Sequence, residues 1–242
     1  MKKFFASSLL CVVLPFQAQA GTVYFSSDFE SAVDHGSTID DNGYTLRTVF
    51  GDPALGTLGS LNGQALILNP SAASSYEQVK LNLGYGASKY HVEFDVESAG
   101  LTTSDYSLTL HFDTPTIQNL SFADCCSNSI STFNPNAVNP IGHLGSVSDN
   151  TLMHVNINID LDLAMWTIGI PGVGSGSGGF YSDGGDIESL RFSLSPALGG
   201  AGADPSVFVG IDNLVVSSVP VPGAAWLFGS ACLMLAGWRA RC

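Results

Sequence analysis

Apolar and polar residues alternate in short runs along most of the chain, the pattern of strands that bury one face. The clearest run is 153–163, where the odd-numbered residues are apolar and the even-numbered residues are polar. Similar runs occupy 22–29, 44–50, 64–69, 76–83, 90–97, 106–113, 117–122, 166–170, 187–194 and 207–216. Turn-forming segments such as Asp41-Asn42-Gly43 separate them. The pattern therefore predicts about eleven strands and no helix between residues 21 and 217.

This spacing of strands predicts an all-β fold of antiparallel strands. Strands that follow one another without helices between them are typical of sandwiches and barrels. Strand lengths vary and several connections are long, which favours a two-sheet jelly-roll sandwich over a closed barrel. No repeat of fixed period is present, so we expect one β-sandwich domain at 21–217.

The first twenty residues have the features of a secretory signal helix. Lys2 and Lys3 precede a short apolar run at 4–16, and Ala18-Gln19-Ala20 supplies the small residues that signal peptidase requires. The apolar run is too short to span a bilayer. We therefore expect export of the chain and cleavage after Ala20.

The C-terminal segment 218–242 combines a proline motif, an uncharged stretch and an arginine cluster. Residues 223–238 carry no charge, which predicts a transmembrane helix held at its end by arginines, with a buried C-terminal helix as the alternative. The order of these parts resembles the PEP-CTERM sorting signal in its VPxP variant. That resemblance implies transient anchoring in the inner membrane, removal of the tail by an exosortase, and delivery to the cell surface or extracellular matrix. Val221 stands where many members have Glu, which leaves the exosortase subtype open. The residues of the motif are Val219, Pro220, Val221, Pro222, Arg239 and Arg241.

Charge is distributed very unevenly. The chain has 8 Lys+Arg and 21 Asp+Glu, and only Arg47, Lys80, Lys89 and Arg191 lie between the two end segments. Neutralising phosphates requires many cationic side chains, so nucleic acid is excluded as a partner, and anionic lipid is disfavoured for the same reason. The hydrophobic fraction of 45% is sufficient for a sizeable core.

The polar ends of the domain suggest a structural Ca²⁺ site. The run 153–163, its return at 166–170, the run 90–96 and the closing run 208–216 resemble a concanavalin A/laminin G-like jelly roll. In many carbohydrate-binding modules of this type the first and last strands pair, and acidic residues there bind Ca²⁺ through oxygen ligands. The corresponding residues are Asp28 and Glu30 at the start, and Asp212 and Asn213 at the end. The alternative is that they are ordinary surface residues.

Glu93, Asp95 and Glu97 are the candidate catalytic residues. Alternation places the three carboxylates on one strand face, about 6.5–7 Å apart in succession. The pattern resembles the acidic strand of family 16 glycoside hydrolases, which implies a retaining glycosidase. The alternative, which we favour, is a solvated strand face, because any half-buried strand alternates in this way and the domain contains only Trp166 to line a cleft. No HExxH or GxSxG motif is present.

Two further segments have open interpretations. The glycine-rich stretch 172–179 predicts a mobile loop. Cys125 and Cys126 are adjacent, and a strained disulfide between them, pairing with another chain or two free thiols all remain open.

The expected function is that of an exported surface or matrix protein without catalytic activity that binds exopolysaccharide. A glycoside hydrolase and a purely structural matrix component are the alternatives. Expected partners are signal peptidase, an exosortase and exopolysaccharide.

Overall fold

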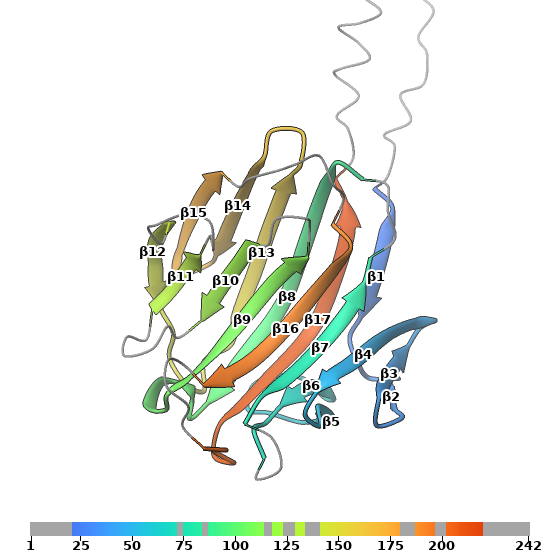
Figure 1. Cartoon of the computed structure of the whole chain (residues 1–242), viewed down its shortest axis with the longest axis vertical. Helices are drawn as coiled ribbons and strands as arrows, with labels where there is room; N and C mark the ends of the chain where they lie inside the picture. The colour runs from blue at the N-terminus through green and yellow to red at the C-terminus, as the bar shows by residue number, and fades with distance from the viewer. Residues whose placement is uncertain are drawn as a thin grey trace, which may run out of the picture. The chain divides into compact units, whose positions relative to one another are not determined.

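Two antiparallel sheets face each other in the structure, a computed structural model that describes residues 21–71, 75–83, 87–113, 118–122, 129–133, 141–179, 187–196 and 202–219 (Figure 1). Each strand pairing in the described residues is antiparallel. This confirms the predicted all-β, two-sheet architecture. Contacts group Thr22–Val219 into one compact unit.

Sheet A is ordered β15-β14-β13-β8-β17-β6-β5, and β1 pairs with the last strand, β17. The longest strands, β8 and β17, lie side by side at its centre. Its strands are β1 (Val23–Ser27), β5 (Ala54–Gly56), β6 (Ala65–Leu68), β8 (Lys89–Ala99), β13 (Met153–Asp160), β14 (Met165–Ile170), β15 (Gly174–Gly179) and β17 (Phe208–Ser218).

Sheet B is ordered β12-β11-β10-β9-β16-β7-β4-β3-β2. Its strands are β2 (Val33–Asp34), β3 (Thr38–Asp41), β4 (Tyr44–Phe50), β7 (Glu77–Asn82), β9 (Tyr106–Asp113), β10 (Gln118–Phe122), β11 (Ser129–Phe133), β12 (Ile141–Ser146) and β16 (Ser189–Pro196).

All eleven strands predicted from alternation are present, with ends displaced by a few residues. The displacement is clearest in β13, which was predicted to reach residue 163. The strand stops at Asp160, and the chain turns through Ala164, whose φ is 51°. The strands that the pattern did not reveal are β2, β3, β5, β11, β12 and β15. The first three have two to four residues, too few to display a period.

The prediction of a mobile loop at 172–179 was wrong, because Gly174–Gly179 forms the edge strand β15. Its glycines allow close approach of neighbouring groups. A Cβ on Gly174 would lie 2.0 Å from the Leu144 carbonyl oxygen, and a Cβ on Gly178 would lie 2.9 Å from the Trp166 ring. A strand without side chains on its inner face thus fits where β12 and β15, the edges of the two sheets, approach each other.

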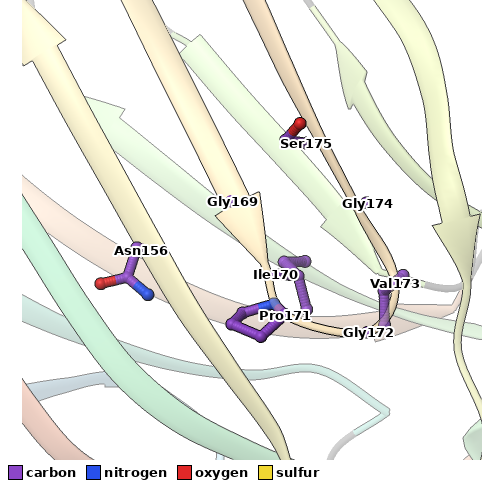
Figure 2. Close-up of a pocket in the computed structure, with 8 residues that line it drawn as sticks. All are labelled: Asn156, Gly169, Ile170, Pro171, Gly172, Val173, Gly174 and Ser175. Carbon is purple, nitrogen blue, oxygen red and sulfur yellow. The ribbon is translucent and has the colours of Figure 1, made fainter.

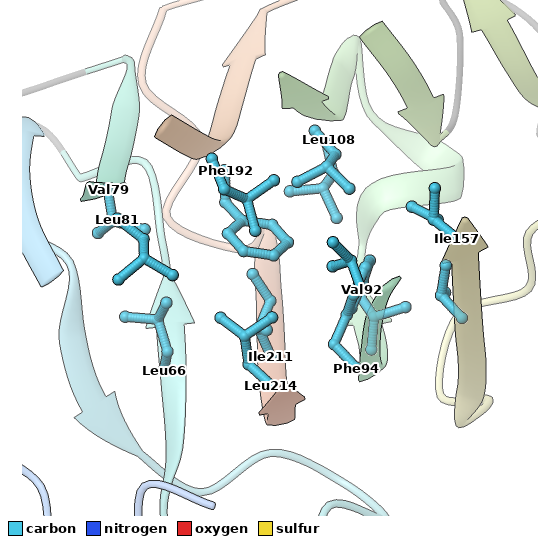
Figure 3. Packing of buried hydrophobic residues seen from close by; sticks show 14 of the residues in the cluster. Leu66, Val79, Leu81, Val92, Phe94, Leu108, Ile157, Phe192, Ile211 and Leu214 are labelled. Carbon is cyan, nitrogen blue, oxygen red and sulfur yellow. The ribbon is translucent and has the colours of Figure 1, made fainter. Parts of the chain in front are cut away.

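The core consists of the inward-facing residues of both sheets (Figure 3). Val92, Phe94 and Val96 of β8 are buried, as alternation predicts. Phe94 packs edge-on against Phe192 of sheet B, with ring centroids 5.2 Å apart. Burial of apolar area of this kind, at roughly 25 cal/mol per Å², is what holds the two sheets together.

The described part of the chain has one short 3₁₀ helix, Leu101–Thr103, and no α-helix. Within that part, no helix has the length and apolar character that crossing a membrane requires. Three predictions concern segments outside the described residues. They are the signal helix at 1–20, the state of Cys125 and Cys126, and the tail 218–242, of which only Ser218 and Val219 are described.

Glu77 on β7 is a buried carboxyl group. Its side chain has no exposed surface, its Oε2 accepts a hydrogen bond from the Asp52 N–H (3.0 Å), and its Oε1 has no partner among the described atoms. Burial raises the pKa of Glu77 to about 7, with the Asp52 N–H acting in the opposite direction and the Asp52 charge adding to the increase.

We expect Glu77→Gln to remove a pH-dependent part of the stability. The pKa of Glu77 is higher in the folded protein than in the unfolded chain. The contribution of Glu77 to the free energy of unfolding is therefore fully present below about pH 4.5, and it is lost as pH rises through about 7. At pH 8 the variant should be more stable than the parent, by up to about 3 kcal/mol, and at pH 4 the two should match. Urea unfolding of parent and variant at both pH values measures the difference in stability. A difference that is the same at pH 4 and pH 8 would contradict the prediction.

We expect Gly174→Ala to destabilise the domain, because the new Cβ meets a backbone oxygen that cannot move without shifting β12. Overpacking of this kind costs roughly 1–3 kcal/mol. Gly169→Ala is the matched control, since no atom lies within 4 Å of its Cβ position. Urea midpoints of the two variants provide the comparison, and equal midpoints would show that the close approach has no energetic consequence.

Candidate functional site

The outer face of sheet A is polar over its central strands. On β8, His91, Glu93 and Asp95 point outward, because the residues between them fill the core. On β13 the even-numbered residues His154, Asn156 and Asn158 point the same way. The polar face predicted for both strands is thus present, and the register of β8 against β13 brings the two sets together.

Asp95 is the hub of the polar contacts on this face. Its Oδ1 lies 2.7 Å from His154 Nδ1, and its Oδ2 accepts a hydrogen bond from Asn213 Nδ2 (2.8 Å). Asn213 reaches this position because β17 bulges between Asp212 and Val215, with Asn213 at a φ of 49°. Both oxygens of Asp95 are therefore engaged, Oδ1 with the His154 ring and Oδ2 with the Asn213 amide.

Glu93 has a different partner. Its Oε2 lies 3.3 Å from His91 Nε2, while His91 Nδ1 lies 2.9 Å from Asn158 Oδ1. About a third of the Glu93 side chain is exposed, and the carboxylate remains accessible from outside. Glu93 is the more accessible of the two carboxylates, since 19% of the Asp95 side chain is exposed.

A first pocket of about 310 Å³ opens on this face where β1, β17, β8 and β13 lie side by side. It presents carboxylate, amide, hydroxyl and imidazole groups. Its lining residues are Ser26, Ser27, Asp28, Asn42, Glu93, His154, Asn213 and Val215.

A second pocket of about 490 Å³ lies further along the same sheet, over β13, β14 and β15 (Figure 2). It is formed by Asn156, Gly169 and the turn 170–175, and it has no charged side chain. No atom lies within 4 Å of the Cβ position of Gly169, so the backbone itself is exposed at this point. The second pocket is therefore shallow and uncharged.

One transverse row of outward positions connects the two pockets. Ser26 pairs with Val215, Val215 with Glu93, Glu93 with Asn156, Asn156 with Gly169, and Gly169 with Ser175. Six strands contribute one residue each, so the row crosses five strand spacings, about 24 Å in all. It enters the first pocket at one end and the second at the other.

The first and last strands, β1 and β17, pair as the resemblance to a jelly roll implied. Asp212 is 2% exposed, and burial raises the pKa of its carboxyl group, with further increases from the charges of Asp95, Glu30 and Asp28, while the Asn213 N–H acts against them. These carboxylates share one neighbourhood. Across the described residues, however, no three His, Cys, Asp or Glu side chains gather closely enough to hold a metal ion.

The three candidate catalytic carboxylates share a face, but Glu97 is closed off. It is 1% exposed, and its Oε2 accepts a hydrogen bond from the Ser60 N–H (2.6 Å). The loop around Gly59 lies directly over it. Only Glu93 and Asp95 could meet a substrate.

Of the predicted sorting motif, only Val219 lies in the described residues. Its N–H donates to the Lys89 carbonyl oxygen (3.1 Å), directly after the end of β17. Pro220, Val221, Pro222, Arg239 and Arg241 lie outside them.

Sequence reasoning missed the contributions of Ser26, Asn42, Gly169 and Ser175. Alternation placed Asn156 on the polar face, but its position opposite Gly169 follows only from strand register. The Asn42-Gly43 turn was visible as a hairpin signal, and both residues have positive φ, but the sequence contains no sign that it borders a pocket.

No family model and no curated protein matches the sequence. Solved structures with a similar fold include the botulinum neurotoxin serotype C1 binding domain, with a TM-score of 0.56 and 12% identity over 84% of this chain. The binding domain of Paraclostridial Mosquitocidal Protein 1 gives 0.55 and 14% over 87%, and a sialidase gives 0.54 and 12% over 82%. This chain spans about half of the two binding domains and 19% of the sialidase chain. At these identities the likeness shows a common fold.

Proposed function

We propose that this chain is an exported surface or matrix protein that binds polysaccharide, without cleaving it, along the outer face of sheet A. The observation that carries the proposal is the transverse row from Ser26 to Ser175, which links two pockets on one face. A row about 24 Å long suits an extended polymer better than a compact small molecule. Binding domains among the structures of similar fold are consistent with this role.

The chemistry of the row suits sugar hydroxyl groups. Hydroxyls donate and accept hydrogen bonds, and the row offers both kinds of partner through Asn156, Glu93 and the serines at its ends. The bare backbone at Gly169 leaves room for a ring to lie close to the sheet. A small number of polar groups at fixed positions in a binding surface are sufficient to orient a ligand.

The geometry favours binding over hydrolysis. A glycosidase needs one carboxyl group as the acid and a second as the nucleophile or base. Asp95 has both oxygens occupied by His154 and Asn213, and Glu97 lies under the Ser60 loop. Only Glu93 remains without two fixed partners. A glycoside hydrolase using Glu93 and Asp95 is the second candidate function, because the two carboxylates share one outward face and a sialidase is among the similar structures.

Export and sorting are proposed from the two end segments. Signal peptidase would cleave after Ala20, the tail 218–242 would anchor the chain in the inner membrane, and an exosortase would remove the tail near Pro220. The product would reach the cell surface or extracellular matrix. A purely structural matrix component would share this route without binding a ligand.

A structural role for Ca²⁺ is proposed at Asp28, Glu30, Asp212 and Asn213. The pairing of β1 with β17 places these segments beside each other, and the carboxylates repel one another where Asp212 is buried. A cation of the size and oxygen preference of Ca²⁺ would relieve that repulsion.

We expect Asn156→Ala to weaken binding of the full chain, kept in mild detergent, to a neutral polysaccharide such as dextran, by roughly five- to tenfold, the effect of losing one or two hydrogen bonds. Asn82→Ala, an exposed asparagine on sheet B, is the matched control and should bind like the parent. Affinity electrophoresis measures both. Equal loss in the two variants, or no binding by the parent, would contradict the proposed function.

The same preparations distinguish the glycosidase. Release of reducing ends from β-glucan should be absent in the parent and in Glu93→Gln. Activity in the parent that disappears in Glu93→Gln would establish the hydrolase instead.

We expect Asp212→Asn to stabilise the Ca²⁺-free protein, because it removes a buried charge that three neighbouring carboxylates oppose. In the parent, Ca²⁺ at about a hundredfold excess over Kd should add about 2.7 kcal/mol, which corresponds to roughly 5–10 °C in Tm. The variant should lose that response. Scanning calorimetry measures Tm with Mg²⁺ as the control ion, and equal shifts with both ions would indicate general charge screening.

A further inference from the structure

Three of the four cationic residues between the end segments lie on the outer face of sheet B. They are Arg47 on β4, Lys80 on β7 and Arg191 on β16, whereas Lys89 lies on sheet A and pairs with Asp160 (2.7 Å). Leu46 and Leu190, the residues directly before Arg47 and Arg191 in their strands, are buried in the core, so the two arginines point outward. The scarce cations of an acidic chain are therefore concentrated on one face.

Strand register places these three residues directly opposite one another. Arg47 pairs with Lys80, Lys80 with Arg191, and Arg191 with His111 of β9. One transverse row, the basic row, thus runs over four neighbouring strands with a basic or titratable residue on each. Three strand spacings give it a length of about 14 Å.

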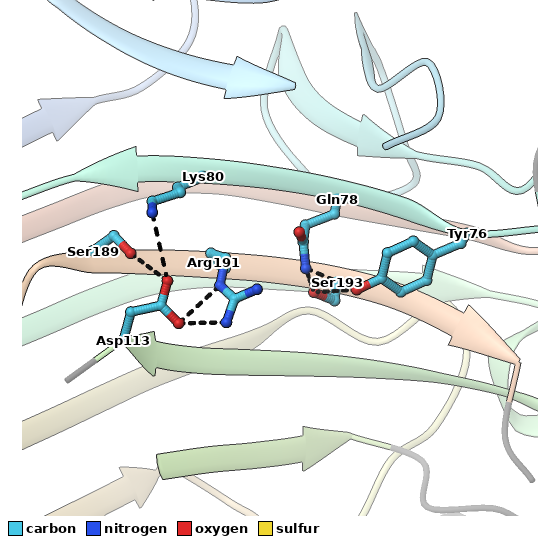
Figure 4. A network of polar contacts seen from close by, with 7 residues as sticks. All are labelled: Tyr76, Gln78, Lys80, Asp113, Ser189, Arg191 and Ser193. Atoms are coloured by element: carbon cyan, nitrogen blue, oxygen red, sulfur yellow. Dashed lines mark hydrogen bonds and ion pairs between the residues drawn. The ribbon is translucent and has the colours of Figure 1, made fainter. Parts of the chain in front are cut away.

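Among the described residues, Asp113 is a carboxylate that pairs with two cations of the basic row. Asp113 accepts hydrogen bonds from Arg191 Nε (2.9 Å) and Nη2, and from Ser189 Oγ (2.5 Å), while Lys80 Nζ lies 3.7 Å from Asp113 Oδ2 (Figure 4). Side chains of Lys80 and Arg191 remain 32% and 25% exposed. Within the described residues no carboxylate lies within 4 Å of the exposed Arg47. The row therefore has more positive than negative charge.

Repulsion between the cations of the basic row opposes folding. Like charges directly opposite on neighbouring strands destabilise a sheet, and Arg191 with Ser189 already satisfies Asp113. A chain with 21 acidic residues also has many places where a cation would be neutralised better. An anionic ligand lying along the row would turn the repulsion into attraction.

An aromatic pair borders the basic row. Phe50 pairs with Gln78, two residues from Lys80 along β7, and its ring packs edge-on against Tyr76 at 5.2 Å. Phe50 is 55% exposed. Gln78 Nε2 donates to Tyr76 Oη (2.8 Å) and Ser193 Oγ (2.6 Å), which fixes the amide between ring and strand (Figure 4). Gln78 and Ser193 are each 1% exposed, so the part of this group that the apolar face of a sugar ring can cover is the exposed Phe50 ring.

We propose that the basic row binds an anionic polysaccharide, one whose sugar rings carry carboxylate or sulfate groups. That the ligand is a polysaccharide rests on the proposed function, whereas its negative charge is inferred from the basic row alone. Arg47, Lys80 and Arg191 arise from neighbouring strands whose backbones lie about 4.8 Å apart, a spacing suited to a polymer with one charge per sugar ring. Duplex DNA carries a charge about every 1.7 Å and would meet three cations on an otherwise acidic protein.

The test compares binding of the full chain, in mild detergent, to a polyuronate, to dextran sulfate and to neutral dextran, at 20 and 300 mM NaCl. Lys80→Gln and Arg47→Gln should each weaken binding to the charged polymers by roughly threefold, as expected for one exposed ion pair. Lys89→Gln is the matched control, with the same change of charge on the other sheet, and should bind like the parent. Lys80→Arg should retain binding, and 300 mM NaCl should weaken it in the parent. Unchanged Tm values verify folding.

Several outcomes would overturn the inference. Equal losses of polymer binding in Lys80→Gln and Lys89→Gln would indicate that binding depends on the net charge of the protein and not on the basic row. Duplex DNA bound as tightly as polyuronate and lost in the same variants would make the ligand class wrong. Salt-sensitive self-association lost in Lys80→Gln, without polymer binding, would assign the row to contacts between copies. Binding of neutral dextran alone would overturn this inference and leave the proposed function standing, whereas binding of no glycan would remove both.

Discussion

Pairing of the last strand, β17, with β8 is the interaction on which the arrangement of this domain depends. The two eleven-residue strands form the centre of sheet A, and β17 also receives β1 and β6 along its other edge. The chain must therefore be complete to its last strand before the sheet can close, which makes the fold rich in long-range contacts. The bulge at Asp212–Val215 in this pairing then sets the direction of Asn213, and through it the orientation of Asp95 and His154.

The two outer faces have opposite character on the same scaffold. On sheet A, carboxylates cluster where β1, β17 and β8 meet, and their charges add to the increase that burial causes in the pKa of Asp212. On sheet B, three of the four available cations line up across β4, β7 and β16. Both faces are built from transverse rows, because residues opposite each other in a ladder point the same way. Each strand contributes one residue to a row, and the properties of a row follow from register alone.

Buried polar groups mark the places where this domain departs from simple alternation. Glu77, Glu97 and Asp212 all have carboxyl groups with almost no exposure. Two of them accept backbone N–H groups of loops that cross a sheet end, Asp52 for Glu77 and Ser60 for Glu97. Carboxyl groups in such positions hold loops against the sandwich through hydrogen bonds, although removing them from water lowers the stability of the fold.

The sequence by itself determined the fold class and most of the strands. Period-two alternation identified eleven strands, including the two longest, because burial of one face imposes that period on a strand. It also placed Glu93, Asp95 and Glu97 on one face, while the pairing of the first and last strands was implied by the resemblance to a jelly roll. The strands of two to four residues β2, β3 and β5 and the glycine-rich β15 were missed, since they have too few apolar side chains to form a pattern, and β11 and β12 were missed as well.

Only the tertiary structure decided which outward residues stand beside one another. Alternation specifies the face of each residue within its own strand, but it contains nothing about the neighbouring strand or the register of the pair. Asn156 beside Gly169, Asp95 beside His154 and Arg47 beside Lys80 all follow from register. The burial of Glu97 likewise depends on a loop that crosses it from elsewhere in the chain. A binding face made of rows over several strands is thus a property of packing and pairing, and local sequence cannot encode it.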